Sequence, residues 1–281
     1  MISRENSYTP DGEKFVGVIT SFSKNKLSNS SHISTSDPDS SLAMKIGAAR
    51  SLKYKVHMSI DKDSRVVLDS KVNTGSCHET QIYLDRLFYI KSKYNLDMTS
   101  VIADRAYGSS KNIKYLQQNS IIGYIPLFSS RSGKIQALMQ KGFQYDKDTQ
   151  EYICPSGIAM KGWKSGDRMI YKISDVICRN CSQNIHCSIP KRQIDGYRRI
   201  RRSYDQDFFE KQINHMKKKD FINAQISRMW QIEGINSEAK NLQGLKRAKY
   251  RGLQKVQIQA YMIAAVMNLK RLITFFYCSF L

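Results

Sequence analysis

The stretch that decides the fold is "VIADRAYGSS", residues 101–110. Residues 101–103 form a short apolar run that is typical of a buried strand, and Gly108, Ser109 and Ser110 are typical of a turn that leads into a helix. Between them stands Asp104, at the tip of the predicted strand. The chain has 45 Lys and Arg against only 24 Asp and Glu, so an acid at the end of a core strand needs an explanation. It either caps a turn or holds a ligand.

The segments around this stretch predict an α/β fold. In residues 54–61 apolar and polar side chains alternate, and residues 65–72 follow after a short turn, which predicts a β-hairpin. We then expect, in order, a helix at 79–94, a strand at 98–104, a helix at 109–120 and a strand at 121–127. This order predicts a mixed sheet with a parallel part and flanking helices. Sites in open α/β sheets lie at the carboxyl ends of strands, which is where Asp104 falls.

Composition narrows the class of protein. The chain has 281 residues, a formal net charge of +21 and 41% hydrophobic residues, which indicates a globular protein that attracts polyanions. Nucleic acid is the first candidate partner and an anionic membrane surface the second. The longest apolar run, residues 272–280, is about half of the ~18–20 residues that a membrane span needs. The N-terminus lacks the apolar core of a secretory signal, so we expect a cytoplasmic protein without a membrane span.

We expect four parts along the chain. Residues 1–50 are rich in Ser, Asn and Lys and poor in large aliphatic residues, which predicts a loop or a disordered segment. The other parts are the first half of the α/β core at 51–135, a Cys-rich insertion at 136–200 and a helical C-terminal part at 201–281. In this last part, segments 220–242 and 253–277 have helical periodicity, and the second carries a broad apolar stripe that we expect to be buried.

Four cysteines form a pattern that favours a metal. They are Cys154, Cys178, Cys181 and Cys187. In a cytoplasmic chain such grouping argues for metal binding rather than for disulfides, and a Cys-x2-Cys turn can place two thiolates on one tetrahedral Zn²⁺. His186 is an alternative fourth ligand, and reduced, packed cysteines are the alternative to a metal site. Cys77 and Cys278 stand alone and are expected to be incidental.

A second acid, Glu233, lies on the predicted helix at 220–242. It follows Met229 and Trp230 by four and three residues, so we expect the helix face around it to be partly buried. Lys240 lies two turns further along the same face, where it either pairs with Glu233 or contacts a phosphate. Further cations surround this region: Arg228, Lys246, Arg247, Lys249, Arg251 and Lys255. The alternative is a solvated helix face with an ion pair that contributes little.

Taken together, the motifs resemble those of the DDE transposases of bacterial insertion sequences. The resemblance begins near residue 32 and rests on the order and spacing of several segments. They are "HISTSDPDS" (32–40), "YKVHMSID" (54–61), "VIADRAYGSSKNIKYL" (101–116) with "YIP" (124–126), "FQYDKDTQEYICPSG" (143–157), the cysteine cluster, and "EGINSEAKNLQGLKRAKYRGLQKVQIQAYMIAAVMNLKRL" (233–272).

The resemblance implies a ribonuclease-H-like core in which three acids hold two Mg²⁺ or Mn²⁺ ions. The second acid of that pattern matches Asp104, and the third matches Glu233, with Lys240 as its basic partner. The Cys-rich stretch is then a zinc-binding insertion between these two acids. Two metal ions can activate the attacking oxygen and stabilise the leaving oxygen of a phosphodiester, and carboxylates suit Mg²⁺. The expected DNA contacts are Arg228, Lys240, Lys246, Arg247 and Arg251.

The first acid of the family pattern has no match in this chain. "PDGEK" (10–14) lacks an apolar strand before it, Asp37 and Asp39 stand in a Pro-containing loop, and Asp61 ends the first strand of the predicted hairpin. We therefore expect an N-terminally shortened, incomplete or inactive copy of a transposase.

Two other readings stay open. One is a non-catalytic, transposase-derived DNA-binding protein with a zinc module. The other is a zinc-ribbon nucleic-acid module beside an unrelated α/β domain. The expected partner is DNA, at the terminal inverted repeats of an insertion element, with a homodimer on DNA as the candidate assembly. The expected location is the nucleoid of a bacterial cytoplasm.

Overall fold

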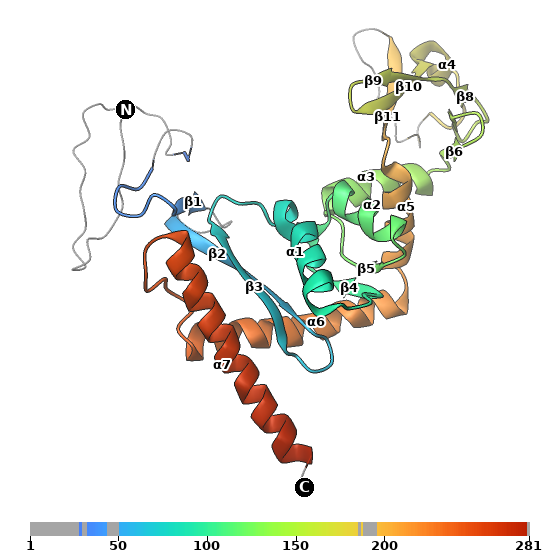
Figure 1. Ribbon diagram of the computed structural model, residues 1–281. Helices are drawn as coiled ribbons and strands as arrows, with labels where there is room; N and C mark the ends of the chain where they lie inside the picture. The colour runs from blue at the N-terminus through green and yellow to red at the C-terminus, as the bar shows by residue number, and fades with distance from the viewer. Residues whose placement is uncertain (1–27, 30–32, 44–50, 185–186, 188–195, 280–281) are drawn as a thin grey trace, which may run out of the picture. The chain divides into compact units, whose positions relative to one another are not determined.

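The computed structural model describes residues 28–29, 33–43, 51–184, 187 and 196–279, so most of the predicted N-terminal segment 1–50 lies outside the described residues. The chain divides into two compact units. The first unit joins Met1–Asp97 to Ile226–Leu281, and the second is Met98–Gln225. The described residues form seven α-helices and several small sheets (Figure 1), so the mixed α/β character predicted from the sequence is confirmed.

The sheet of the first unit contains the predicted hairpin. Strands β1 (Ser41–Ala43), β2 (Ser51–Ile60) and β3 (Val67–Thr74) are antiparallel, in the order β1-β2-β3. Asp61 closes the turn between β2 and β3, because its Oδ2 accepts hydrogen bonds from the backbone N–H groups of Asp63 and Ser64 at 3.1 and 2.7 Å and from the Ser64 hydroxyl at 2.7 Å. These bonds, led by that from the Ser64 hydroxyl, lower the pKa of Asp61.

Helix α1 (Glu79–Tyr94) coincides with the predicted helix. It begins at a capping box in which His78 and Gln81 exchange side-chain and backbone hydrogen bonds. Its Arg86 forms a bidentate ion pair with the buried Asp69 of β3, at 2.7 and 2.6 Å. This pair fixes α1 against the sheet.

Helix α7 (Leu253–Ser279) packs on β3 (Figure 1) and also supplies hydrogen bonds to its backbone. The Asn268 amide accepts from the N–H of Val67 at 2.8 Å and donates to its carbonyl at 2.9 Å. The Gln257 amide does the same for the N–H of Val72 and the carbonyl of Ser70, at 2.8 and 2.7 Å. These two side chains satisfy backbone groups that a neighbouring strand would otherwise satisfy.

The face of α7 that is buried differs from the predicted apolar stripe. Val256 is buried as expected, but much of the expected stripe is 44–63% exposed: Met262, Val266, Leu269, Leu272, Ile273 and Phe276. The buried face instead carries Ala260, Ala264 and Met267 together with Ile263. Small side chains let the helix backbone approach the sheet closely enough for the Asn268 and Gln257 bonds to form, so the large residues point elsewhere.

The second unit contains the predicted parallel pair of strands. β4 (Ser100–Ile102) and β5 (Ile122–Tyr124) are parallel and are joined by the 3₁₀ turn η1 (Arg105–Tyr107) and helix α2 (Ser110–Gln118). Helix α5 (Gln206–Met216) packs against both α2 and α3 (Ser129–Gln140) (Figure 1). Helix α6 (Lys219–Ser237) begins in this unit and continues in the first.

The hairpin and the parallel pair were expected in one sheet, but among the described residues they belong to separate sheets. Side-chain amides again satisfy backbone groups at a strand edge. Gln212 of α5 is buried and donates to the carbonyls of Gly123 and Ile125 at 2.9 and 2.8 Å, so backbone groups of the short strand β5 are satisfied by a helix. A sheet of only two short strands is stable here because helices cover it.

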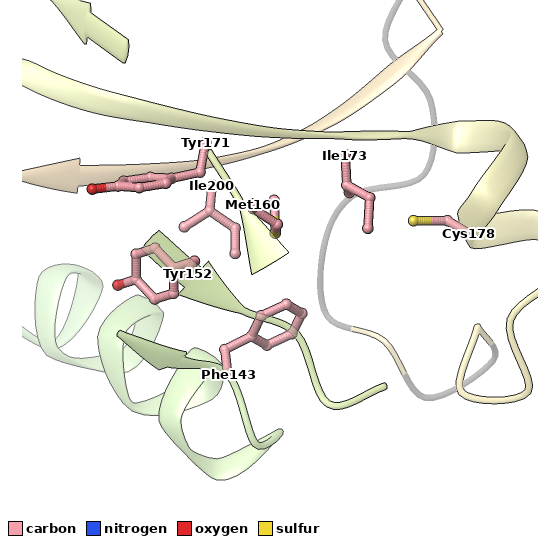
Figure 2. Packing of buried hydrophobic residues seen from close by; sticks show 7 residues of the cluster. All are labelled: Phe143, Tyr152, Met160, Tyr171, Ile173, Cys178 and Ile200. Carbon is pink, nitrogen blue, oxygen red and sulfur yellow. The ribbon is translucent and has the colours of Figure 1, made fainter. Parts of the chain in front are cut away.

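The segment between α3 and α5, which the sequence predicts as an insertion and which we call the insertion, is built from two small antiparallel sheets. One has β6 (Gln144–Asp146), β7 (Glu151–Ile153) and β8 (Ala159–Met160). The other has the order β11-β10-β9, from β9 (Gly162–Ser165), β10 (Arg168–Ser174) and β11 (Tyr197–Ser203), with the short helix α4 (Asp175–Arg179) after β10. Buried side chains from both sheets and α4 form one core (Figure 2): Phe143, Tyr152, Met160, Tyr171, Ile173, Cys178 and Ile200.

A buried arginine connects this insertion to α5. Arg202 is 4% exposed and donates to the Tyr152 hydroxyl at 3.0 Å and to the Glu210 carboxylate at 2.7 Å. It also forms an ion pair with Asp207, and its guanidinium lies 3.8 Å from the centre of the Tyr145 ring. One side chain therefore joins β11 to β6, to β7 and to α5.

Candidate catalytic residues, basic loop and cysteine cavity

Asp104 lies directly after β4, as predicted, where the chain turns into η1. Its Oδ1 accepts a hydrogen bond from the backbone N–H of Arg105 at 2.6 Å, so the side chain caps η1. The residue is exposed, and its second carboxylate oxygen has no hydrogen-bond partner in the described part of the chain. Both roles considered from the sequence are thus compatible, because a capping carboxylate keeps an oxygen for a cation.

Helix α6 is attached to the backbone beside Asp104. The Gln225 amide donates to the carbonyl of Ala103 at 3.3 Å and to that of Tyr124 at 2.6 Å. Ala103 itself continues the parallel pairing by donating to the Tyr124 carbonyl at 3.2 Å. Sequence reasoning missed Gln225, because nothing in the pattern of a single glutamine marks which backbone groups it satisfies.

Glu233 lies further along α6, in the first unit, and is exposed. The face around it was expected to be partly buried, and this was wrong: Met229 and Trp230 are 54% and 58% exposed. Arg65, in the turn between β2 and β3, is a cation close to this face of α6. Its guanidinium lies 5.8 Å from the centre of the Trp230 ring. Arg65 also limits the space at Gly234, where an added Cβ would lie 3.3 Å from its Nη2. Asp104 and Glu233 belong to different units, so their sharing of a metal stays a prediction.

The basic residues after Glu233 form an ordered loop. A π-helical turn, η2 (Glu238–Leu242), ends α6 and carries the exposed Lys240. In the loop that follows, residues 243–252, four exposed cations stand close together in sequence: Lys246, Arg247, Lys249 and Arg251. The buried Gln259 of α7 holds this loop, because its amide accepts from the Lys249 N–H at 2.9 Å and donates to the Arg247 carbonyl at 3.0 Å. We name residues 243–252 the basic loop.

Two acids considered for the missing first position serve instead at the start of α7. Asp39 accepts from the backbone N–H of Leu253 at 2.8 Å, and Asp37 accepts from that of Gly252 at 3.1 Å. Asp37 also accepts from the Tyr54 hydroxyl at 2.6 Å, and burial together with this bond raises the pKa of Tyr54. Acids at this position satisfy free N–H groups and interact favourably with the helix dipole.

The four cysteines of the predicted cluster line one cavity of about 490 Å³. Cys154 follows β7, Cys178 lies on α4, and Cys181 and Cys187 follow it in the chain. The Cys181 sulfur is 3.0 Å from the Ser156 hydroxyl, and this contact lowers the pKa of Cys181, whereas burial raises the pKa of Cys178. Across the described ranges, no three His, Cys, Asp or Glu side chains are arranged to hold a metal ion, so the expected zinc geometry is not formed. His186 lies outside the described residues.

An ion pair that sequence reasoning missed adjoins this cavity. Arg198 lines the cavity, is 2% exposed and donates from Nε to the Asp175 carboxylate at 2.7 Å. Asp175 is also bonded to Arg179 at 2.8 Å, and both arginines lower its pKa, Arg198 most. The signal was present in "YRRIRRS" (197–203), since strand alternation puts Arg198, Ile200 and Arg202 on one face.

An exposed acid at a strand end and an ordered basic loop are together typical of proteins that process nucleic acid. Residues 153–273 match the family model described as a transposase DDE domain, which supports the resemblance to DDE-type transposases over this range. The match includes the cysteine cluster, Glu233 and the basic loop, and Asp104 precedes it. Neither a curated protein nor a solved structure matches the chain. None of the helices in the described residues is long and apolar enough to cross a membrane.

Proposed function

We propose that this protein acts on DNA ends in transposition, with a ribonuclease-H-like core that holds divalent metal ions at Asp104 and Glu233. The observation that carries the proposal is the match of residues 153–273 to the transposase DDE domain. It is supported by the position of Asp104 at the carboxyl end of a parallel strand, where α/β sheets place their sites. Terminal inverted repeats as the target, a homodimer on DNA, and a place in the bacterial nucleoid are parts of the same proposal.

The donor set suits Mg²⁺ or Mn²⁺. Both side chains are exposed carboxylates, and neither forms an ion pair with a described residue. Hard divalent cations prefer such oxygen ligands and keep part of their water. When bound, the ions would activate the attacking oxygen and stabilise the leaving oxygen of the phosphodiester. The protein's own part is to present the two acids from a strand end and a helix.

We also propose that this chain, as given, binds DNA without cutting it. Two-metal chemistry in this family pattern needs three acids, and only two are matched. Asp37 and Asp39 precede β1 and cap α7, and Asp61 follows the antiparallel strand β2 and caps its turn, so none of them stands at the end of a parallel strand as Asp104 does. A non-catalytic, transposase-derived DNA-binding protein is the second candidate function, and this observation favours it.

DNA binding should be strong at low salt and fall steeply as salt is added, because cations of the basic loop displace counterions from phosphates. Replacing Lys246, Arg247 and Arg251 together by alanine should reduce the slope of log K against log salt concentration by about 0.9 for each phosphate that is no longer neutralised. Fluorescence anisotropy with a labelled duplex in EDTA measures this. The control is Lys91→Ala on α1, an exposed cation of the same unit that should leave the slope unchanged. A slope that is equally steep in the triple variant would contradict the assignment.

We propose that Zn²⁺ is the ligand of the cysteine cavity. The support is the gathering of four thiols around one cavity, since four thiolates are the preferred set for structural zinc. Because no three described side chains are arranged to hold a metal ion, the thiols must move closer together on binding, and Cys181 must exchange its Ser156 contact for the metal. Purified protein should contain one zinc ion per chain, Cys178→Ser and Cys181→Ser should lose it, and Cys77→Ser should retain it. Metal-free protein whose thiols all react freely would show that the cavity holds reduced cysteines only.

A further inference from the structure

The sheet β9–β10–β11 has one face turned to the core and one turned to solvent. Tyr171, Ile173 and Ile200 point into the core shown in Figure 2. The register places the alternate residues on the opposite face: Trp163 pairs with Ile170, Ile170 with Arg201, Lys172 with Arg199, and Ser174 with Tyr197. We name this the outer face of the insertion.

The outer face is basic in the part of the chain that the structure describes. The three strands include no Asp or Glu, while four cations stand on this face: Arg168, Lys172, Arg199 and Arg201. Among the described residues beside it, Asp167 lies in the turn between β9 and β10 and pairs with Arg168 at 2.8 Å. A surface with this imbalance attracts a polyanion.

The same face carries two exposed aromatic rings, which electrostatics alone does not require. Trp163 is 37% exposed and Tyr197 is 43% exposed. Lys172 of the central strand lies over both, with Nζ 4.3 Å from the centre of the Trp163 ring and 5.4 Å from that of the Tyr197 ring. The cation thus holds the two rings in place across three strands.

We propose that the outer face binds single-stranded DNA, with unpaired bases stacking on Trp163 and Tyr197 and phosphates contacting Lys172, Arg199 and Arg201. Cations with interleaved aromatic side chains are the combination that single-strand-binding proteins use. Bases in a duplex are stacked on one another and cannot reach rings that lie on a sheet, so a duplex would use only the charges. That the nucleic acid is DNA rests on the proposed function. The insertion would then bind the unpaired strand of that DNA.

The experiment uses the full chain with Trp230→Phe, which leaves Trp163 as the single tryptophan, since the chain has two. An oligothymidine of about 12 nucleotides is titrated in EDTA, where no metal-dependent cleavage occurs. We expect saturable quenching of Trp163 fluorescence, and no quenching with a duplex of equal length. In the same background, anisotropy should show that Tyr197→Ala weakens binding of the single strand about tenfold, as loss of one stacked base predicts.

Two further variants control the result. Trp163→Ala, measured by anisotropy, should also weaken single-strand binding about tenfold, whereas Phe128→Ala, at an exposed aromatic residue of the same unit, should bind as the parent does. Because binding is measured without metal, failure of DNA cleavage leaves this test intact. The proposal is overturned if single strands leave Trp163 fluorescence unchanged, if a duplex quenches it equally, or if Tyr197→Ala and Trp163→Ala bind as tightly as the parent.

Discussion

Replacing Arg202 by alanine should lower the free energy of unfolding of the second unit by about 3 kcal/mol, because it breaks a buried charge network rather than a surface ion pair. The substitution removes the hydrogen bonds to Tyr152 and Glu210, the ion pair with Asp207 and the contact with the Tyr145 ring. Glu210 is then left partly buried beside the Tyr152 hydroxyl without the cation that compensates its charge. Urea denaturation followed by fluorescence and circular dichroism measures the decrease in stability.

The neighbouring residue provides a matched control for this prediction. Arg201 is one position away on the same strand but lies on the outer face and is exposed, so Arg201→Ala should change stability by less than about 0.5 kcal/mol. Arg202→Met keeps much of the side-chain volume but none of the charge, and should be nearly as destabilising as alanine if the carboxylates are what need the arginine. If Arg202→Ala and Arg201→Ala unfold at the same urea concentration, the network does not hold β11 to α5.

The order of strands and α-helices from β2 to β5 could be predicted because each has a strong local signal, whereas β1 lies in the segment 1–50 that was expected to be a loop or disordered. Alternation identified the hairpin of β2 and β3, and periodicity identified α1 with the bounds that the structure has. The apolar run before Asp104 placed that residue at the end of a parallel strand, which the pairing of β4 with β5 confirms. These features depend on neighbours in the sequence, so the sequence alone is sufficient to predict them.

Features that depend on distant partners could not be predicted in this way. Gln212, Gln257 and Asn268 satisfy strand backbone groups through their side chains, and so decide where sheets end, but each is an unremarkable polar residue in its helix. The buried face of α7 was predicted from its large apolar residues, whereas close packing on β3 selects the small ones, Ala260 and Ala264. Hydrophobicity predicts that a helix is buried more reliably than it predicts which side.

The candidate sites show the same difference between features that depend on neighbouring residues and features that depend on distant ones. The four cysteines line one cavity, but no three described side chains there are arranged to hold a metal ion, so the zinc site expected from their spacing stays a prediction. Strand alternation in residues 197–203 groups Arg198 with the apolar Ile200, but its burial in that cavity also depends on Asp175, which is distant in the sequence. Likewise the exposure of Glu233 and its neighbours contradicts a burial pattern that had been inferred from Met229 and Trp230 alone.

The 281-residue chain should bind a DNA end carrying a terminal repeat but leave it uncut in Mg²⁺ or Mn²⁺. Only Asp104 and Glu233 match the acids of the family pattern, and no third carboxylate to hold two ions in place is identified among the described residues. Each ion supplies several kcal/mol of transition-state stabilisation. Loss of about 4 kcal/mol already corresponds to a factor of roughly 10³ in rate. Electrophoresis of an end-labelled duplex measures cleavage, and electron paramagnetic resonance of free Mn²⁺ measures metal binding.

The variants decide which acids are involved. Asp104→Asn and Glu233→Gln should each weaken Mn²⁺ binding by at least about tenfold, because an amide supplies a neutral oxygen in place of a charged one. Their DNA affinity in EDTA should be unchanged, since neither substitution removes a cation. If the parent chain does cut DNA, cleavage by Asp61→Asn is compared with cleavage by Asp63→Asn. Asp61 is the candidate first acid and holds the turn after β2 through its Oδ2, and Asp63 is an exposed neighbouring acid that serves as the control. Cleavage abolished only in Asp61→Asn would make Asp61 the first acid, and cleavage that persists in Asp104→Asn would remove Asp104 from the site.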